Sequence, residues 1–97
     1  MKFMLTYSFT TDNWVAGLKR FTGGDPTQEF PEGVTMIGRW HNVASRSGIA
    51  IIESDSSEAL MNYAVKWNDI LDTTITPVVE DAEAGQIAAT LIAERGW

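Results

Sequence analysis

Hydrophobic and polar positions alternate over four short stretches of the chain, with the period of two that is typical of β-strands. These stretches are Lys2–Phe9, Val34–His41, Ile49–Ser54 and Thr73–Val79. Pro77 lies in the last of them and has no N–H to donate to a neighbouring strand. We therefore predict four strands, with the fourth at an edge of the sheet.

Between and after these stretches, apolar residues recur three and four positions apart, which predicts amphipathic helices. The first helix begins near Trp14 and ends at the two glycines Gly23 and Gly24. The second has Asp55 as its N-cap and reaches about Trp67, and the third covers 80–95. By their spacing, Trp14, Leu18 and Tyr63 are expected in the core.

The resulting order of elements is β-α-β-β-α-β-α, which is that of a ferredoxin-like α+β fold with an added C-terminal helix. The segment 42–48 is a hairpin loop, so the strands on either side of it are antiparallel neighbours. We expect one domain over residues 1–97, with a four-stranded antiparallel sheet whose first and third strands are central.

Apolar side chains occur on both faces of this predicted sheet. In the first strand, one face has Phe3, Leu5, Tyr7 and Phe9, and the other face has Met4. In the third strand, Ile49 and Ile51 point to one face, and Ala50 and Ile52 point to the other. In the second strand, Met36 and Trp40 share one face, and Ile37 lies on the other. Helices cover only one face of such a sheet, and a large exposed apolar patch is unusual on a monomer. We expect a homodimer that buries the second face about a two-fold axis. The alternative is that the third helix wraps round and covers this face itself.

Composition narrows the classes of function. The net charge is −6, from 13 acidic and 7 basic residues, and no basic stripe is present, so we expect no nucleic-acid partner. No cysteine is present, which excludes disulfides, thiolate metal sites and cysteine nucleophiles. No apolar run approaches the ~20 residues that span a membrane. We expect a cytoplasmic protein without a metal, a cofactor or a membrane partner.

Arg39 and His41 are the side chains best suited to chemistry, because strand alternation places both on one face and Trp40 on the other. His41 is the single histidine, so it can be a general base or a loop cap but not a metal site by itself. A buried arginine needs a counter-charge or water. We expect Arg39 to pair with an acid or to open onto a water-filled pocket, the candidate acids being Glu53, Asp69 and Asp72. The alternative for Asp69 and Asp72 is that they lie at a turn after the second helix and are solvated there.

Three blocks of the chain resemble a small bacterial family of unknown function. They are the opening residues 1–9, residues 31–34 leading into Gly38-Arg39-Trp40-His41, and residues 67–72 with 76–78 after them. That family is similar in pattern to dimeric α/β barrels, in which two ferredoxin-like sheets face each other. The resemblance implies a dimer but no activity, because such barrels include monooxygenases, haem-degrading enzymes, lactone isomerases and effector-binding proteins. The haem-degrading branch has an asparagine on the first strand, where this chain has Thr6 and Ser8.

Two main hypotheses of function follow. In the first, the dimeric barrel binds a small anionic or aromatic molecule between sheet and helices, and the 22–33 loop closes over it. The candidate ligand-binding residues are Tyr7, Phe30, Arg39, Trp40, His41 and Trp67. In the second, the chain is a non-catalytic homodimeric structural or interaction module. A further alternative is a cofactor-independent monooxygenase-like enzyme, although no residue is assigned a catalytic role.

Overall fold

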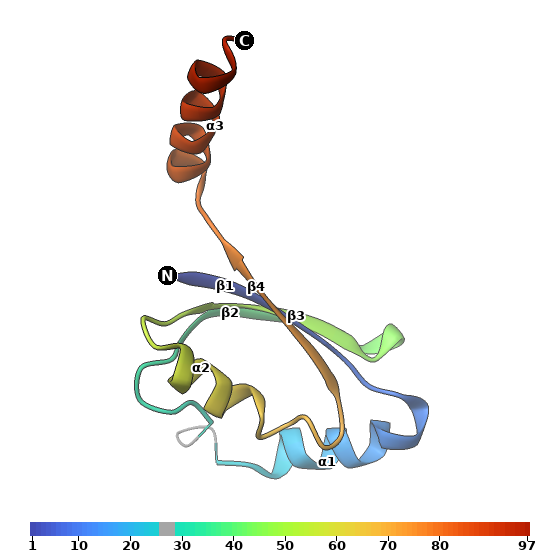
Figure 1. Cartoon of the computed structure of the whole chain (residues 1–97). Coiled ribbons are helices and arrows are strands. Elements are labelled where there is room, and N and C mark those ends of the chain that lie inside the picture. The colour runs from blue at the N-terminus through green and yellow to red at the C-terminus, as the bar shows by residue number, and fades with distance from the viewer. Residues whose placement is uncertain (26–28) are drawn as a thin grey trace.

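The computed structural model describes residues 1–25 and 29–97 and has the predicted α+β fold, with the helices and strands arranged as Figure 1 shows. Its main elements are β1 (Lys2–Ser8), α1 (Trp14–Gly23), β2 (Thr35–Asn42), β3 (Ser47–Glu53), α2 (Ser57–Ala64), β4 (Asp72–Val78) and α3 (Asp81–Arg95). One 3₁₀ turn, Thr11–Asn13, precedes α1, and another, Val43–Ser45, joins β2 to β3. In that hairpin Arg46 takes a left-handed conformation with φ of 56°, and Ser45 N donates to Asn42 Oδ1.

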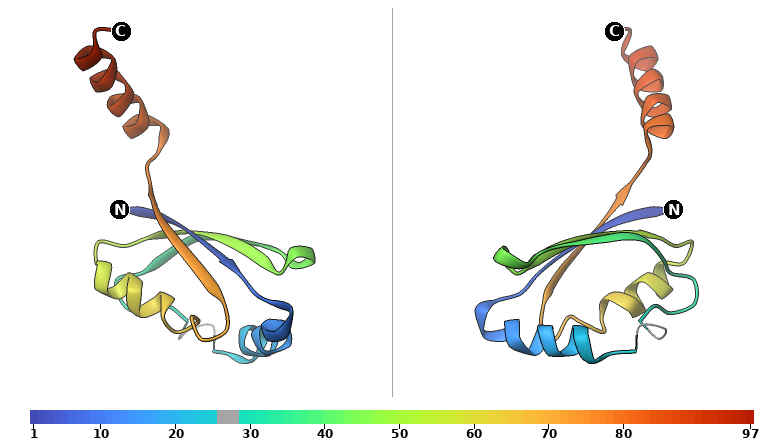
Figure 2. Two further views of the ribbon diagram at one scale, coloured as in Figure 1. Left: turned by 45° about the vertical axis from the view of Figure 1, so that its right-hand side comes forward. Right: turned by 180° about the vertical axis from the view of Figure 1, so that it is seen from behind.

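The four strands form one antiparallel sheet in the order β2-β3-β1-β4. This order confirms the ferredoxin-like topology, the central position of β1 and β3 and the edge position of β4. Leu5 lies opposite Ala50 on one side and Ile75 on the other. We call the face that carries these residues the inner face, because α1 and α2 both lie beneath it (Figure 2).

The hydrophobic core lies between the inner face and α2. Its buried members are Leu5, Val34, Ala50, Ile52, Leu60 and Tyr63. Between α1 and the sheet the packing is looser, since Gly17 is the one buried residue of that helix. The prediction that Trp14 and Leu18 belong to the core is therefore wrong. Leu18 is 40% exposed, and both side chains border a cavity.

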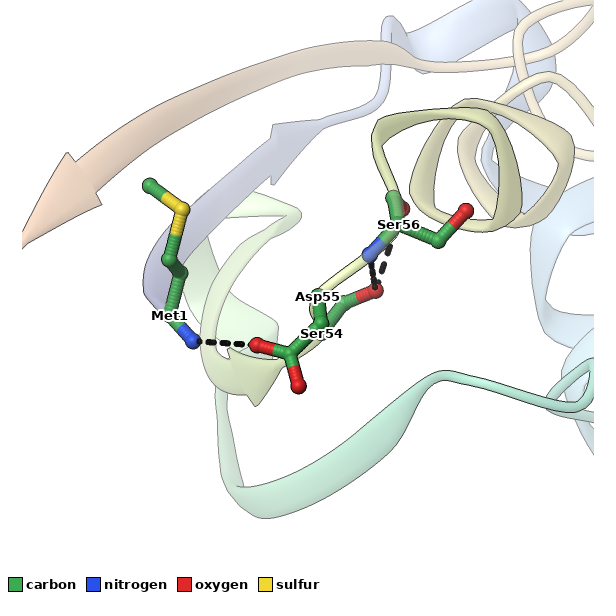
Figure 3. A network of polar contacts seen from close by, with 4 residues as sticks. All are labelled: Met1, Ser54, Asp55 and Ser56. Carbon is green, nitrogen blue, oxygen red and sulfur yellow. Dashed lines mark hydrogen bonds and ion pairs between the residues drawn. The ribbon is translucent and has the colours of Figure 1, made fainter.

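The start of α2 differs from the prediction. Ser56 is the N-cap, and its hydroxyl accepts a hydrogen bond of 3.1 Å from Ala59 N. Asp55 instead accepts a hydrogen bond of 3.2 Å from the amino group of Met1, and the buried Ser54 hydroxyl accepts one from Ser56 N (Figure 3). A serine hydroxyl in an extended backbone suits the cap as well as a carboxylate does, so the residue type alone does not decide between neighbours.

The other end of α2 also comes earlier than expected. The helix ends at Ala64, and the chain continues through turns, with Ile70 N donating to Trp67 O at 3.1 Å. The predicted extension to Trp67 is therefore wrong by about one turn.

Strand β2 contains a bulge between Met36 and Gly38. Met36 lies opposite Ile52, on the inner face, whereas Trp40 lies opposite Ile49, on the other face, which we call the outer face. Because an extra residue shifts the alternation of side chains, the predicted common face of Met36 and Trp40 is wrong.

Helix α3 projects beyond the sheet on the side away from α1 and α2, as the views of Figures 1 and 2 agree. All of its residues are exposed. The radius of gyration is 16.6 Å, whereas a compact domain of this length has about 12.5 Å. The alternative in which this helix covers its own sheet is thus contradicted. Among the described residues, no helix combines the length and apolar character needed to cross a membrane.

Candidate functional site

A cavity of about 180 Å³ lies between the inner face of the sheet and the helices α1 and α2. It is partly open to solvent, and most of its wall is apolar. The residues that line it are Leu5, Tyr7, Phe9, Trp14, Gly17, Leu18, Phe21, Glu29, Arg39, His41, Val43, Ser47, Ala50, Tyr63, Ala64, Trp67, Leu71 and Thr73. The cavity exists because α1 stands off the sheet where the core side chains end.

Aromatic rings form the α1 side of the cavity. Phe9 and Trp14 meet edge to face, with ring centroids 5.6 Å apart. Gly17 lies directly against the Phe9 ring, and a Cβ at that position would collide with it. The absence of a side chain on Gly17 therefore sets how closely α1 approaches the end of β1.

The polar end of the cavity is built around Tyr7 and His41, whose hydroxyl and Nδ1 share a hydrogen bond. Tyr7 is on β1 and His41 on β2, with β3 between them. Both residues lie opposite Gly48 of β3. The Tyr7 ring covers Gly48, where a Cβ would collide with it. A residue with a side chain at position 48 would separate the two groups, so this glycine allows a contact across a whole strand.

The tyrosine and histidine are both uncharged near pH 7. Burial raises the pKa of Tyr7 above its ordinary value of 10.0, with the Arg39 charge opposing this. Burial lowers the pKa of His41 below 6.5, and the nearby positive charge of Arg39 lowers it further. A neutral imidazole has one nitrogen that donates and one that accepts. The pair therefore offers an uncharged donor and acceptor to the cavity.

Arg39 forms an ion pair with Glu29 at the same end of the cavity. The two side chains are only 18% and 20% exposed, and the guanidinium also lies over the Phe21 ring, 5.2 Å from its centroid. Burial opposes the charge on Arg39, but the hydrogen bond and charge of Glu29 prevail, so its pKa is raised. The predicted partners Glu53, Asp69 and Asp72 are wrong. Glu29 belongs to a loop without periodicity, which gave no signal of where it would lie.

Arg20 joins α1 to the turn after α2, next to Trp67 of the cavity wall. Its NH1 and NH2 donate to the two carboxylate oxygens of Asp69, each at 2.8 Å, and NH1 also donates to Lys66 O. The guanidinium lies 5.4 Å from the centroid of Trp67. The hydrogen bond from Arg20 lowers the pKa of Asp69. Asp69 was expected to solvate a turn, and it instead ties two parts of the chain together.

The predicted ligand-binding residues divide into those that line the cavity and those that lie elsewhere. Tyr7, Arg39, His41 and Trp67 line the cavity. Phe30 packs on Tyr63, with ring centroids 4.8 Å apart. Trp40 is 60% exposed and borders a separate shallow depression on the outer side, together with Asn42 and Ile49.

Phe30 belongs to the 22–33 loop that was predicted to close over a ligand. Residues 26–28 of this loop lie outside the described residues. Sequence reasoning missed Glu29 and Tyr63 as neighbours of Arg39; the alternation of β2 pointed to the face of Arg39 but not to what a loop would bring there.

Within the described residues, no group of three or more acidic or histidine side chains is placed to hold a metal ion. The chain matches the model of a protein family over residues 1–92, and it therefore belongs to that family, described as a domain of unknown function, DUF3303. Among curated proteins, none matches the chain.

Proposed function

We propose that this member of the DUF3303 family binds an uncharged aromatic molecule that carries one hydroxyl or carbonyl group. The observation that carries the proposal is the two-ended cavity, with aromatic rings along α1 and the neutral Tyr7–His41 pair on the sheet. Concave sites with apolar walls and a few convergent polar groups are the usual form of small-molecule sites.

The size of the cavity favours a ligand with one ring. A dry apolar cavity of about 150 Å³ is large enough for benzene. The cavity here, at about 180 Å³, leaves room for a benzene ring with one or two small substituents. Phe21 and Trp14 would pack against its faces or edges, as aromatic pairs do.

The charges at the polar end favour an uncharged ligand. Glu29 already neutralises Arg39, and the tyrosine and histidine carry no charge near pH 7. A carboxylate entering the cavity would have to displace Glu29 or remain without a counter-charge, and either is costly in a partly buried site. A phenol can instead donate to and accept from the neutral pair.

Three probes of matched shape test this proposal: 4-methylphenol, 4-methylbenzoate and 1,4-dimethylbenzene, each titrated by calorimetry into the whole chain at pH 7.5. We expect 4-methylphenol to bind at least tenfold more tightly than either of the others. Tyr7→Phe removes one hydroxyl and should abolish most of this preference, because the affinity for the hydrocarbon does not depend on that group. Equal binding of all three probes, or none, would contradict the proposal.

An aromatic substitution outside the cavity supplies the control. Phe21→Ala removes part of the wall and should weaken 4-methylphenol about tenfold, whereas Trp40→Ala should leave its binding unchanged because Trp40 lies on the outer face. Loss of binding in Trp40→Ala would restore this residue as a ligand contact and would place the site on the other side of the sheet.

The second candidate is a non-catalytic homodimeric module, and the Arg39–Glu29 pair favours it. In that hypothesis the ion pair and the Tyr7–His41 bond serve to hold β1, β2 and the loop together. It predicts that no probe binds while Glu29→Ala lowers stability. The cytoplasmic location expected from the sequence stays a prediction under both candidates.

A further inference from the structure

We propose that α3 of one chain packs across the outer sheet face of a second copy, so that two copies exchange their C-terminal helices reciprocally. This inference concerns the side of the sheet opposite the cavity and does not depend on the proposed ligand. It commits to a second copy of this chain as the occupant of the outer face.

The first observation is the exposed apolar stripe of α3. Ile87, Leu91 and Ile92 are 60%, 39% and 48% exposed, and Ala84 and Ala88 share their side of the helix. This spacing of i, i+3, i+4, i+7 and i+8 is that of a helix face that packs on another element. No element in the described part of the chain packs on this stripe, and every residue of α3 is exposed.

The second observation is the outer face of the sheet. Met4 lies opposite Ile51 and Thr76, and Thr6 lies opposite Ile49 and Thr74, so the centre of this face carries no charge. Trp40 folds along it over Gly38, where a Cβ would collide with the indole ring. Both described helices that pack on the sheet lie on the inner side, which leaves the outer face without a cover (Figure 2).

The connection from β4 to α3 directs the helix away from its own sheet. Only Val79 and Glu80 separate the two elements, and Glu80 is extended, with ψ of 169°. The Glu80 side chain forms an ion pair with Lys2 of β1, which fixes the point where the helix leaves the sheet. The apolar stripe therefore needs a surface on another molecule.

A second copy provides that surface with matching dimensions. Helix α3 has 15 residues and the β1 strand has 7, so the helix is about 22 Å long and the strand spans about 23 Å. Two such helix-on-sheet contacts in a symmetric pair bury on the order of 1,000 Å², which is near the lower limit for a specific interface. Reciprocal exchange of an identical element is a common route to dimers.

Light scattering across a dilution series tests the assembly. We expect the wild-type chain to have about twice its monomer mass of 10.7 kDa at micromolar concentration. Leu91→Asp should weaken the dimer about 100-fold, because it buries a carboxylate in an apolar contact. Gln86→Asp adds the same charge to the opposite side of α3 and should leave the dimer intact. A wild-type monomer, or equal loss in both variants, would overturn the proposal.

Cross-linking then identifies which surfaces meet. The chain has no cysteine, so Leu91→Cys and Trp40→Cys each add a single reactive thiol, and both side chains are exposed in the isolated chain. The two variants, refolded together and treated with a short bismaleimide, should give a dimer that contains one chain of each. A dimer that forms instead only between two Leu91→Cys chains would mean that α3 pairs with α3, and it would overturn the exchange onto the sheet. Circular dichroism of each variant should match the wild type, since neither position is buried within one chain.

Discussion

Both sides of the sheet carry apolar side chains, but within the described residues the inner side alone is covered by helices of the same chain. On the inner side Ile52 and Leu60 are almost fully buried, and Arg39 has Glu29 as a counter-charge. On the outer side Trp40 is 60% exposed, and the stripe on α3 is open. The comparison shows that the hydrophobic pattern determines which faces have to be covered. The loops that join helices to strands determine whether the covering helix comes from the same chain or from another one.

The helices α1 and α3 illustrate this difference in connections. Helix α1 joins two strands, β1 and β2, and a crossover between strands has to return to the sheet. Helix α3 follows the last strand and is held at one end only, after two residues of extended chain. Both have an apolar stripe, yet only α1 is brought back beneath its own sheet.

The largest expected effect separates these two environments directly. Leu60→Ala empties a buried position of α2 and should lower the free energy of unfolding by about 2–5 kcal/mol. Leu91→Ala on α3 should change it by less than about 0.5 kcal/mol in dilute monomer, since no packing within the chain is lost. Urea unfolding below the dissociation range measures both. A comparable loss in the two variants would mean that α3 packs on its own chain in solution.

A smaller effect is expected from the ion pair on the inner side. Glu29→Ala leaves Arg39 partly buried without its counter-charge and should cost about 2 kcal/mol of stability. Glu32→Ala, in the same loop but exposed, serves as the matched control and should be close to neutral. The measurement is again urea unfolding, and equal stability of both variants would show that the pair is no more than a surface contact.

Gly48→Ala tests the contact across β3. The new Cβ would collide with the Tyr7 ring, so the ring should move and stability should fall by about 1–2 kcal/mol. Gly23→Ala is the control, because among the described atoms none lies within 4 Å of a Cβ at that position. Tyrosine fluorescence quenching and the NMR shift of the His41 imidazole would report the loss of the Tyr7–His41 bond. An unchanged imidazole signal would contradict the role given to Gly48.

The smallest effect concerns pH. The pKa of His41 is lower in the folded chain than its ordinary 6.5, so the unfolded chain takes up the proton first as the pH falls. Stability is therefore full above about 6.5 and declines as the pH drops from there through the folded pKa. His41→Gln should remove this decline. The Asp69 carboxylate, with its lowered pKa, loses its contribution only at more acidic pH, below its ordinary 3.8.

The fold was predictable because its signals are local. Alternation located all four strands, Pro77 identified the edge strand, and two glycines marked the end of α1. The errors arose where a choice depended on neighbours in space. Ser56 replaced Asp55 as the N-cap, and the bulge after Met36 changed the face of Trp40, because a single inserted residue leaves almost no trace in an alternating pattern.

The candidate site was predictable only in part, for a similar reason. Strand alternation correctly put Arg39 and His41 on one face, because side chains two positions apart in any β-strand point to the same side. The counter-charge of Arg39 comes from Glu29 in an irregular loop, and the partner of Asp69 is Arg20, 49 positions away. Such long-range pairs follow from the three-dimensional arrangement, and one sequence contains no pattern that specifies them.

The two edges of the sheet have a consequence for behaviour at high concentration. Strand β4 carries Pro77, which lacks an N–H, and β2 carries the bulge between Met36 and Gly38, which interrupts regular pairing. Exposed, regular edge strands are the templates on which chains add to one another without limit, and proline and bulges are features that blunt them. Neither edge of this sheet is therefore a good template for fibril growth. Concentrated solutions should show closed assemblies of fixed size, without the thioflavin-binding aggregates that open-ended strand addition produces.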